Sequence, residues 1–267
     1  MLIDIHTHFF PDKIADKTIK YLLSEAHGEV KVNGVGTYAS LVAYMKRDGV
    51  TLSVNQPVAT KKEQVLGINR KMLEYNKTQK EVLCFGAMHP DFCDVADCNE
   101  EIQFLATNGF KGIKLHPEYQ QFYPDDPKML RIYEACRKAH MIIMFHAGAD
   151  FAYPDIHATP ERLAQVTTIA ELQIICAHMG GYNMWEEVIK YLVGKNCWLD
   201  TAYSQEMDST QFAEIIKYHG ADKIIFGTDF PWVNAAQIKE KIEKIFPNDI
   251  ETKEKIYYKN AMQLLGL

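Results

Sequence analysis

Two histidines, His6 and His8, lie near the start of the chain inside the apolar run 2–10. In an extended strand, residues i and i+2 point to the same face, so both imidazoles leave the strand side by side. Two imidazoles in this arrangement are half of a zinc site. A chain with 10 histidines can also contain such a pair without function, so the pair needs support from the rest of the sequence.

The same pattern recurs three times further along the chain. Apolar runs over 142–145, 172–177 and 224–228 end in His146, His178 and Asp229, and each of these residues is followed two positions later by Gly or Pro. Gly and Pro mark the place where a strand becomes a loop. We therefore expect five side chains that can bind a cation, all at the ends of strands.

Strand-like and helix-like patterns alternate along the whole sequence, without a linker or a low-complexity segment. Near-continuous apolar strands separated by helices are typical of a parallel sheet covered on both sides, and eight such units predict a (β/α)8 TIM barrel. The sequence thus predicts an α/β fold and a single domain over residues 1–267. Strands are expected at 2–8, 51–55, 82–88, 112–116, 142–147, 172–178, 197–202 and 224–229. Helices are expected at 13–26, 38–48, 61–78, 97–108, 127–140, 159–170, 184–194, 208–219, 234–246 and 251–265.

The segment 9–50 departs from this alternation, because it holds two helical patterns between the first two strands. We interpret it as a helical insertion after strand 1, at the C-terminal mouth of the barrel. Active sites of this fold lie at that mouth. His6, His8, His146, His178 and Asp229 would then face one cavity from strands one, five, six and eight, and the insertion is either a lid over this cavity or a decoration.

Composition excludes several classes of function. The net charge of −6 comes with dispersed Lys and Arg, which argues against nucleic acid as a partner. No apolar stretch approaches the about 18 residues that span a bilayer, so we expect no membrane segment. The six cysteines form neither a C-x-x-C motif nor a dense framework, which favours reduced thiols in a cytoplasmic protein.

The motifs together resemble the amidohydrolase superfamily of metal-dependent barrels. Within it they resemble the second amidohydrolase group, which includes aminocarboxymuconate semialdehyde decarboxylase, related decarboxylases and lactone hydrolases. The resemblance covers essentially the whole chain and rests on IDIHTH at 3–8, GIKLHP at 112–117, AHMGG at 177–181, FGTDFP at 226–231 and NAMQLLGL at 260–267.

This resemblance implies that His6, His8, His146 and Asp229 bind one divalent metal ion per chain, with Zn²⁺ as the expected ion. Such an ion lowers the pKa of a bound water toward about 7. His178 resembles the acid/base residue beside that water, although it could also be a metal ligand or a satisfied core histidine. Asp229 has a possible second role as acceptor of the water's proton.

Lys114 and His116 share one face of the fourth predicted strand, so both point into the mouth or both point outward. If they point inward, Lys114 and His116 are substrate-binding residues. Alternatively, a carbamylated Lys114 could bridge two metal ions, as in related superfamily members, with His178 holding the second ion. A structural role for Lys114 is the third interpretation.

Weaker expectations concern residues around these motifs. Trp232 could lie over a substrate or simply pack its loop. Asp4 shares a strand face with His6 and could orient an imidazole from below, and Asp200 is expected on the inner face of the strand 197–202 as a supporting partner of the site. Arg131 and Arg162 are alternative cations for a substrate carboxylate.

Three functions fit this sequence. The first is a metal-dependent hydrolase that acts on an amide, lactone or ester of a small organic acid through a zinc-activated water. The alternative is a metal-dependent non-oxidative decarboxylase of an unsaturated or aromatic carboxylic acid. A metal-binding barrel without turnover is the third. We expect a small carboxylic acid or ring compound as substrate, and a homodimer on base rates alone.

Overall fold

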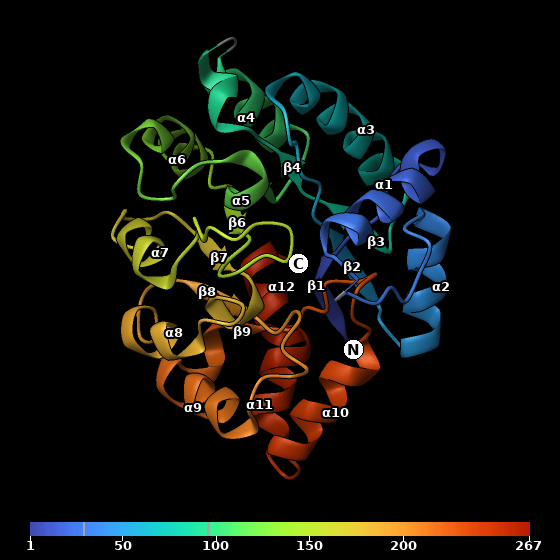
Figure 1. The fold of residues 1–267 in the computed structure, drawn as a ribbon, viewed down its shortest axis with the longest axis vertical. Coiled ribbons are helices and arrows are strands. Elements are labelled where there is room, and N and C mark those ends of the chain that lie inside the picture. Colours follow the sequence, from blue (N-terminus) through green and yellow to red (C-terminus); the bar gives the residue numbers. More distant parts are fainter. Residues whose placement is uncertain (29, 95–96) are drawn as a thin grey trace.

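The computed structural model describes residues 1–28, 30–94 and 97–267, so residue 29 of the predicted insertion lies outside the described part. Its strands run parallel and lie side by side in sequence order (Figure 1). One sheet has the order β1-β2-β3 and the other the order β4-β5-β6-β7-β8-β9. The strands are Ile3–Thr7 (β1), Leu52–Asn55 (β2), Val82–Cys84 (β3), Gly86–Ala87 (β4), Gly112–Leu115 (β5), Ile142–Phe145 (β6), Ile174–Cys176 (β7), Trp198–Asp200 (β8) and Ile224–Ile225 (β9).

Backbone hydrogen bonds join the two sheets and bring the last strand back to the first. The amide of Phe85, between β3 and β4, donates to the carbonyl of Asn55, so β3 and β4 are two parts of the predicted strand 82–88. On the other side of the ring, the backbone amide of Ile5 donates to the carbonyl of Phe226, and the backbone amide of Asp229 donates to the carbonyl of His6. The result is a TIM-barrel-like ring, and each predicted strand overlaps an observed one.

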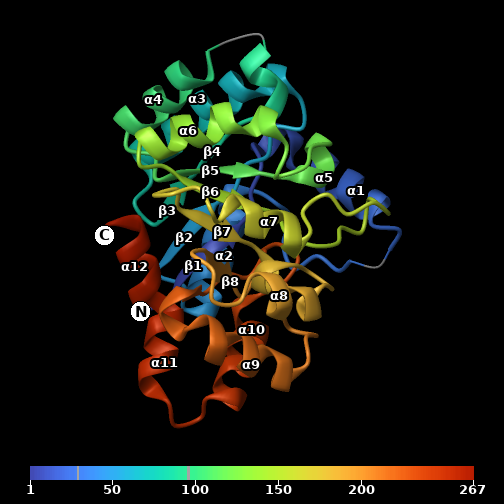
Figure 2. The ribbon, with the colours of Figure 1, turned by 90° about the vertical axis from the view of Figure 1, so that its left-hand side faces the viewer.

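The helices surround this ring (Figures 1 and 2). They are Asp12–Glu25 (α1), Tyr38–Asp48 (α2), Val65–Thr78 (α3), Cys98–Thr107 (α4), Pro117–Gln120 (α5), Leu130–Lys138 (α6), Pro160–Val166 (α7), Trp185–Tyr191 (α8), Ser209–His219 (α9), Ala235–Ile245 (α10), Ile250–Glu254 (α11) and Asn260–Leu265 (α12). Two helices, α1 and α2, lie between β1 and β2, and side chains cap several starts; Thr37, for example, accepts from the amide of Ser40 at α2. Of the helices described, none is long and apolar enough to cross a bilayer.

The structure corrects the prediction of one continuous helix over 251–265. This helix is divided by a π-helical stretch, Lys255–Lys259, between α11 and α12. In this stretch the carbonyl of Ile256 accepts a hydrogen bond from the amide of Phe226, directly after β9. A π turn removes a regular i→i−4 bond, which makes a carbonyl available to an outside donor. The interruption therefore ties the last helix to the last strand.

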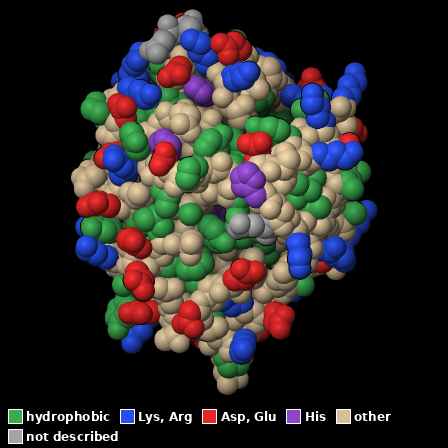
Figure 3. Space-filling model, viewed as in Figure 1, with side chains coloured by type: hydrophobic (Ala, Val, Ile, Leu, Met, Phe, Trp, Pro, Cys, Tyr) green, Lys and Arg blue, Asp and Glu red, His purple; other side chains and the backbone are tan. Residues whose placement is uncertain are grey.

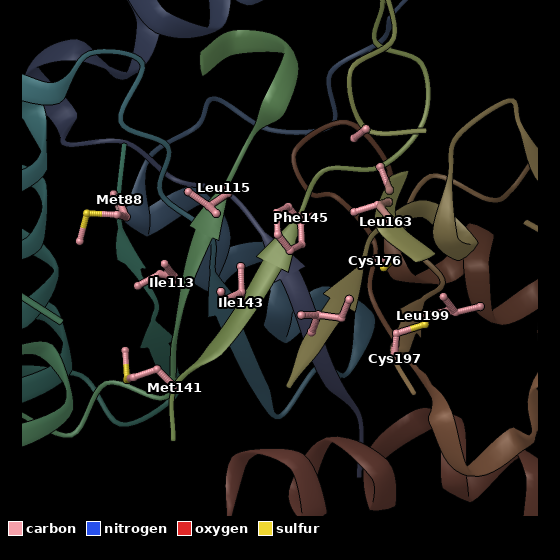
Figure 4. Close-up of a cluster of buried hydrophobic side chains, with 14 of the residues drawn as sticks. Met88, Ile113, Leu115, Met141, Ile143, Phe145, Leu163, Cys176, Cys197 and Leu199 are labelled. Atoms are coloured by element: carbon pink, nitrogen blue, oxygen red, sulfur yellow. The ribbon is translucent and has the colours of Figure 1, made fainter. Parts of the chain in front are cut away.

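Two apolar clusters hold the ring together. The larger one packs strand residues against the outer helices, and Figure 4 shows Ile113 and Leu115 of β5 beside Ile143 and Phe145 of β6. The smaller one joins the strands to α12. Side chains of these strands are buried except for Leu52 and Leu83, which are partly buried, as expected for parallel strands covered on both sides.

A buried carboxylate fastens β1 to the segment after β9. Asp4 accepts hydrogen bonds from the hydroxyls of Tyr44 (2.6 Å) and Thr228 (2.6 Å) and from the amides of Thr228 (3.0 Å) and His6 (3.2 Å). Burial raises the pKa of Asp4 to about 7, although these hydrogen bonds favour the charged form. The expectation that Asp4 orients the His6 ring is wrong, because the register of β1 against β2 shifts between Asp4 and Thr7. Such an irregularity redirects side chains, and Asp4 meets α2 instead.

We expect Tyr44→Phe to lower the free energy of unfolding by about 1–3 kcal/mol, because it removes a donor from a fully buried carboxylate. Chemical denaturation followed by circular dichroism measures this loss. Tyr218→Phe is the matched control, because Tyr218 is 59% exposed, and should stay within about 0.5 kcal/mol of wild type. Equal stability of the two variants would contradict the role given to Asp4.

Candidate functional site

A cavity of about 690 Å³ opens at the C-terminal ends of the strands. Its lining brings together every predicted site residue: His6, His8, Lys114, His116, His146, His178, Asp229 and Trp232. These residues are scattered over most of the sequence, and the barrel makes them neighbours. Hydrophobic side chains gather near the middle of this face of the molecule (Figure 3).

His6, His8 and Asp229 form the tightest part of the site. The Nε2 atoms of His6 and His8 lie 3.4 Å and 3.0 Å from Oδ1 of Asp229. The other ring nitrogens are anchored, since Nδ1 of His6 lies 2.9 Å from Oδ2 of Asp200 and Nδ1 of His8 lies 2.9 Å from the carbonyl of Gln56. These partners accept hydrogen bonds, so both Nδ1 atoms carry the proton and both Nε2 atoms present a lone pair.

His146 and His178 extend this cluster on its other side. Nδ1 of His146 lies 3.1 Å from Nε2 of His178. The remaining nitrogens face backbone carbonyls, with Nε2 of His146 3.2 Å from Ala149 and Nδ1 of His178 3.2 Å from Ala202. A carbonyl oxygen only accepts, which places the protons on those two nitrogens. Each of the two facing nitrogens, Nδ1 of His146 and Nε2 of His178, then presents a lone pair to the other.

Two lone pairs at 3.1 Å repel each other unless a cation binds one of them or a proton lies between them. Burial opposes the proton, because it lowers the pKa of His178 and lowers the pKa of His146 well below the usual value. The donor set therefore fits a divalent metal ion.

Asp229 supplies the negative charge of this donor set. The imidazoles of His6 and His8 hold the pKa of its carboxyl well below the usual range, although burial acts in the opposite direction. Its backbone φ is +69°, and that of His178 is +59°, both in a region that non-glycine residues rarely adopt. Such conformations cluster at functional sites, where the surrounding structure enforces them.

Asp200 of β8 organises three groups from below the site. Its Oδ2 accepts from Nδ1 of His6, and its Oδ1 accepts from the amides of His178 (2.8 Å) and Ala202 (3.0 Å). One fully buried carboxylate thus fixes the ring of one histidine and the backbone of another. The sequence placed Asp200 on the correct strand, but its partners depend on tertiary contacts.

His146 also belongs to a second cluster, with His116 and Asp150. The rings of His116 and His146 are stacked 4.2 Å apart, and Oδ2 of Asp150 lies 3.6 Å from Nε2 of His116. The carboxylate of Glu118 completes the group, with Oε2 3.7 Å from Nδ1 of His116. Burial raises the pKa of Glu118 to about 7 and that of Asp150 to about 6. Sequence reasoning missed both carboxylates, because neither follows a strand directly.

Lys114 projects into the centre of the site from β5. Its side chain is 1% exposed, and its Nζ has no hydrogen-bond partner among the described residues. Burial lowers the pKa of its amine to about 8, against the opposing effect of Asp200, Asp229 and Glu118. A buried amine without a partner is costly to the fold, and it is suited to an anionic ligand.

The other residues weighed from the sequence occupy the edge of the site or the surface. Trp232 lines the cavity and is partly buried. Arg162 pairs with Asp125 at 2.6 Å, and Arg131 donates to the carbonyl of Cys93. Both arginines lie outside the cavity lining, so the expectation that they could reach a substrate carboxylate there is wrong.

Asp200→Asn should weaken the binding of a divalent metal ion about 10–100-fold, because a neutral amide supports the basicity of the His6 ring less well. Competition between the protein and a chromogenic chelator measures the affinity. Asp222→Asn changes an exposed carboxylate on the far side of β9 and should leave it unchanged. Wild-type affinity in Asp200→Asn would show that this carboxylate has no influence on the donor set.

Comparison with solved structures finds the same fold in decarboxylases of aromatic acids. A 5-carboxyvanillate decarboxylase from Sphingomonas paucimobilis has a TM-score of 0.73 and 14% identity, over 100% of this chain and 99% of that one. A 2,6-dihydroxybenzoate decarboxylase in complex with 2,6-dihydroxybenzoate has a TM-score of 0.73 and 16% identity, with the same coverage. A dihydroxybenzoic acid decarboxylase from Polaromonas, with bound manganese and 2-nitroresorcinol, has a TM-score of 0.73 and 17% identity, over 100% and 97%.

Sequence comparison gives the family. No curated protein matches the chain. The model of the Amidohydrolase family, the second amidohydrolase group, matches residues 3–267. Because this match spans nearly the whole chain, the protein belongs to the amidohydrolase family, in the group of aminocarboxymuconate semialdehyde decarboxylase.

Proposed function

We propose that this protein is a metal-dependent non-oxidative decarboxylase of an aromatic carboxylic acid. The observation that carries the proposal is the buried, unpaired amine of Lys114 beside the histidines and Asp229. An acid substrate brings the hydrogen-bond acceptor that this amine lacks among the described residues. The structural similarity to three decarboxylases of aromatic acids supports the same reaction class.

We infer that His6, His8, His146 and Asp229 hold one divalent metal ion. Zn²⁺ suits a set rich in imidazole, whereas manganese is the ion bound in the Polaromonas structure. A divalent ion bound here would orient the acid and draw electron density from its oxygen atoms. The donor set is asymmetric, because His146 reaches it through Nδ1 and the other two imidazoles through Nε2.

In this proposal Lys114 binds the substrate through its ammonium group. A charged amine attracts a carboxylate strongly in a water-poor cavity, and Asp200 and Asp229 help to keep it charged. His116 and Trp232 line the same cavity and contact the ring of the acid. Without a metal bridge, Lys114 needs no carbamylation.

In this proposal His178 is the residue that accepts and donates the proton. Its Nδ1–H is held by the carbonyl of Ala202, so Nε2 is the atom that takes and gives a proton. In the reaction the bond between the ring carbon and the carboxylate breaks, and carbon dioxide leaves without that electron pair. The ring carbon keeps the pair and receives a proton from Nε2 of His178, which takes up that proton from water beforehand. Asp229 is a poorer donor than His178, because its imidazole neighbours keep it ionised.

The hydrolase suggested first by the sequence becomes the second candidate. The same donor set could activate a water for attack on an ester, lactone or amide. A neutral carbonyl substrate would, however, leave the amine of Lys114 without a charged hydrogen-bond acceptor. A barrel without turnover accounts for neither the unpaired amine nor the strained backbone at His178 and Asp229.

We also propose three features of the architecture. Residues 1–267 form one domain, segment 9–50 is a helical insertion over the mouth of the barrel, and the protein associates as a homodimer. The position of α1 in the cavity lining supports the second of these proposals.

Metal-loaded protein should release carbon dioxide from a hydroxybenzoic acid, and His178→Asn should reduce kcat about 10²–10⁴-fold. Release of labelled carbon dioxide from a carboxyl-labelled acid measures both rates. His140→Asn, which changes an exposed histidine at the end of α6, is the control and should keep wild-type activity. Hydrolysis of a lactone in place of decarboxylation would favour the second candidate.

Lys114→Met should weaken binding of a benzoate-type inhibitor about tenfold or more, since it removes the counter-charge. The pKa of the amine is about 8, so it is charged below pH 8 and neutral above. Affinity of the wild type should therefore fall as the pH rises through 8, while that of Lys114→Met should stay flat. Inhibition constants between pH 6.5 and 9.5 test this, and parallel curves would contradict the role of Lys114.

A further inference from the structure

Helix α1 has two apolar faces, and only one of them packs into the core. Ala15 and Ile19 are buried against the rest of the protein. Ile14 and Tyr21 lie on another face, because positions i and i+7 nearly coincide on a helix, whereas Leu22 lies close to the face of Ala15 by the same rule. That second face lines the cavity, where Ile14 is 49% and Tyr21 53% exposed.

A second wall of the cavity, at α3 and the segment before it, also carries apolar side chains. Val58, Ile68 and Met72 line it, and the last two are one turn apart on α3. The charged residue of this wall, Lys71, is paired with Glu74 at 2.5 Å. The outer part of the cavity is thus an apolar groove, while the inner part carries Lys114 and the histidines.

The volume of the cavity also indicates a ligand larger than an acid with a single ring. Its volume of about 690 Å³ lies in the middle of the range of roughly 300–1,000 Å³ that is typical of sites for drug-sized ligands. An acid with a single ring, anchored at Lys114, would occupy the inner part and leave the groove to water. Water against half-exposed apolar side chains is unfavourable, and a ligand that displaces it gains affinity.

We propose that the ligand of this site is a carboxylic acid with an extended apolar body, longer than one ring, which lies along α1 between Tyr21 and Met72. The inference deepens the proposed function and rests on it for the position of the carboxylate. The body is either a second ring or a hydrocarbon chain, since both offer apolar surface that can pack against the apolar side chains of the groove.

Calorimetric titration of the metal-loaded protein with three acids that share one head group tests this. The probes are benzoate, 2-naphthoate and 4-hexylbenzoate, and the last two separate a ring from a chain. We expect at least one of them to bind about tenfold or more tighter than benzoate. Equal affinities for all three acids would overturn the proposal.

Variants of α1 test where the longer acid makes the contacts that tighten its binding. Ile14→Asp and Tyr21→Asp should each abolish the tighter binding of the longer acid and leave the affinity for benzoate within about twofold. Ile250→Asp is the matched control, because Ile250 is 66% exposed on α11 and lies outside the cavity lining. A gain that survives both α1 variants would overturn the placement along α1.

Carbon dioxide release from a hydroxybenzoic acid, measured beside these titrations, separates this proposal from the proposed function. Tighter binding of the longer acid without release of carbon dioxide would contradict decarboxylation and leave the apolar groove supported. Release from benzoate-type acids without any gain for the longer probes would contradict the groove alone.

Discussion

The junction between the first and the last strand of the ring is the constraint on which the site depends. Backbone bonds from Ile5 to Phe226 and between His6 and Asp229 set these segments side by side, and the carboxylate of Asp4 fastens them. This junction puts two imidazoles from one end of the sequence against a carboxylate from the other. Without it, the H-x-H pair would have no third ligand.

The positions of the protons on the four imidazoles then determine what the site can bind. Each of the four imidazoles faces an acceptor with one nitrogen, so in the neutral ring its other nitrogen presents a lone pair within the site. Burial keeps His6, His146 and His178 neutral by lowering their pKa values. A site of this kind favours a divalent cation over a proton, and Lys114 adds a place for an anion beside it.

Much of this arrangement could be predicted from the sequence, because strands and their ends are local patterns. An apolar run followed by His146 or Asp229 predicts both the strand and its functional end. The contacts of individual side chains are harder to predict from the sequence, since they depend on how the helices and strands pack against one another. Asp4 meets Tyr44 because of an irregularity in β1 that no periodicity shows. Glu118 enters the site from the short helix α5, which lacks the length that makes a helical pattern visible.

The metal content of the purified protein tests the central claim most directly. We predict about one divalent ion per chain by elemental analysis of protein prepared without chelator, its loss in His6→Ala, and its retention in Lys114→Ala. Thermal unfolding of both variants confirms that they are folded. Protein without any divalent ion, even after incubation with Zn²⁺ or Mn²⁺, would contradict the account. Two ions per chain, one of them lost in Lys114→Ala, would make Lys114 a bridging ligand instead of an anchor for the acid.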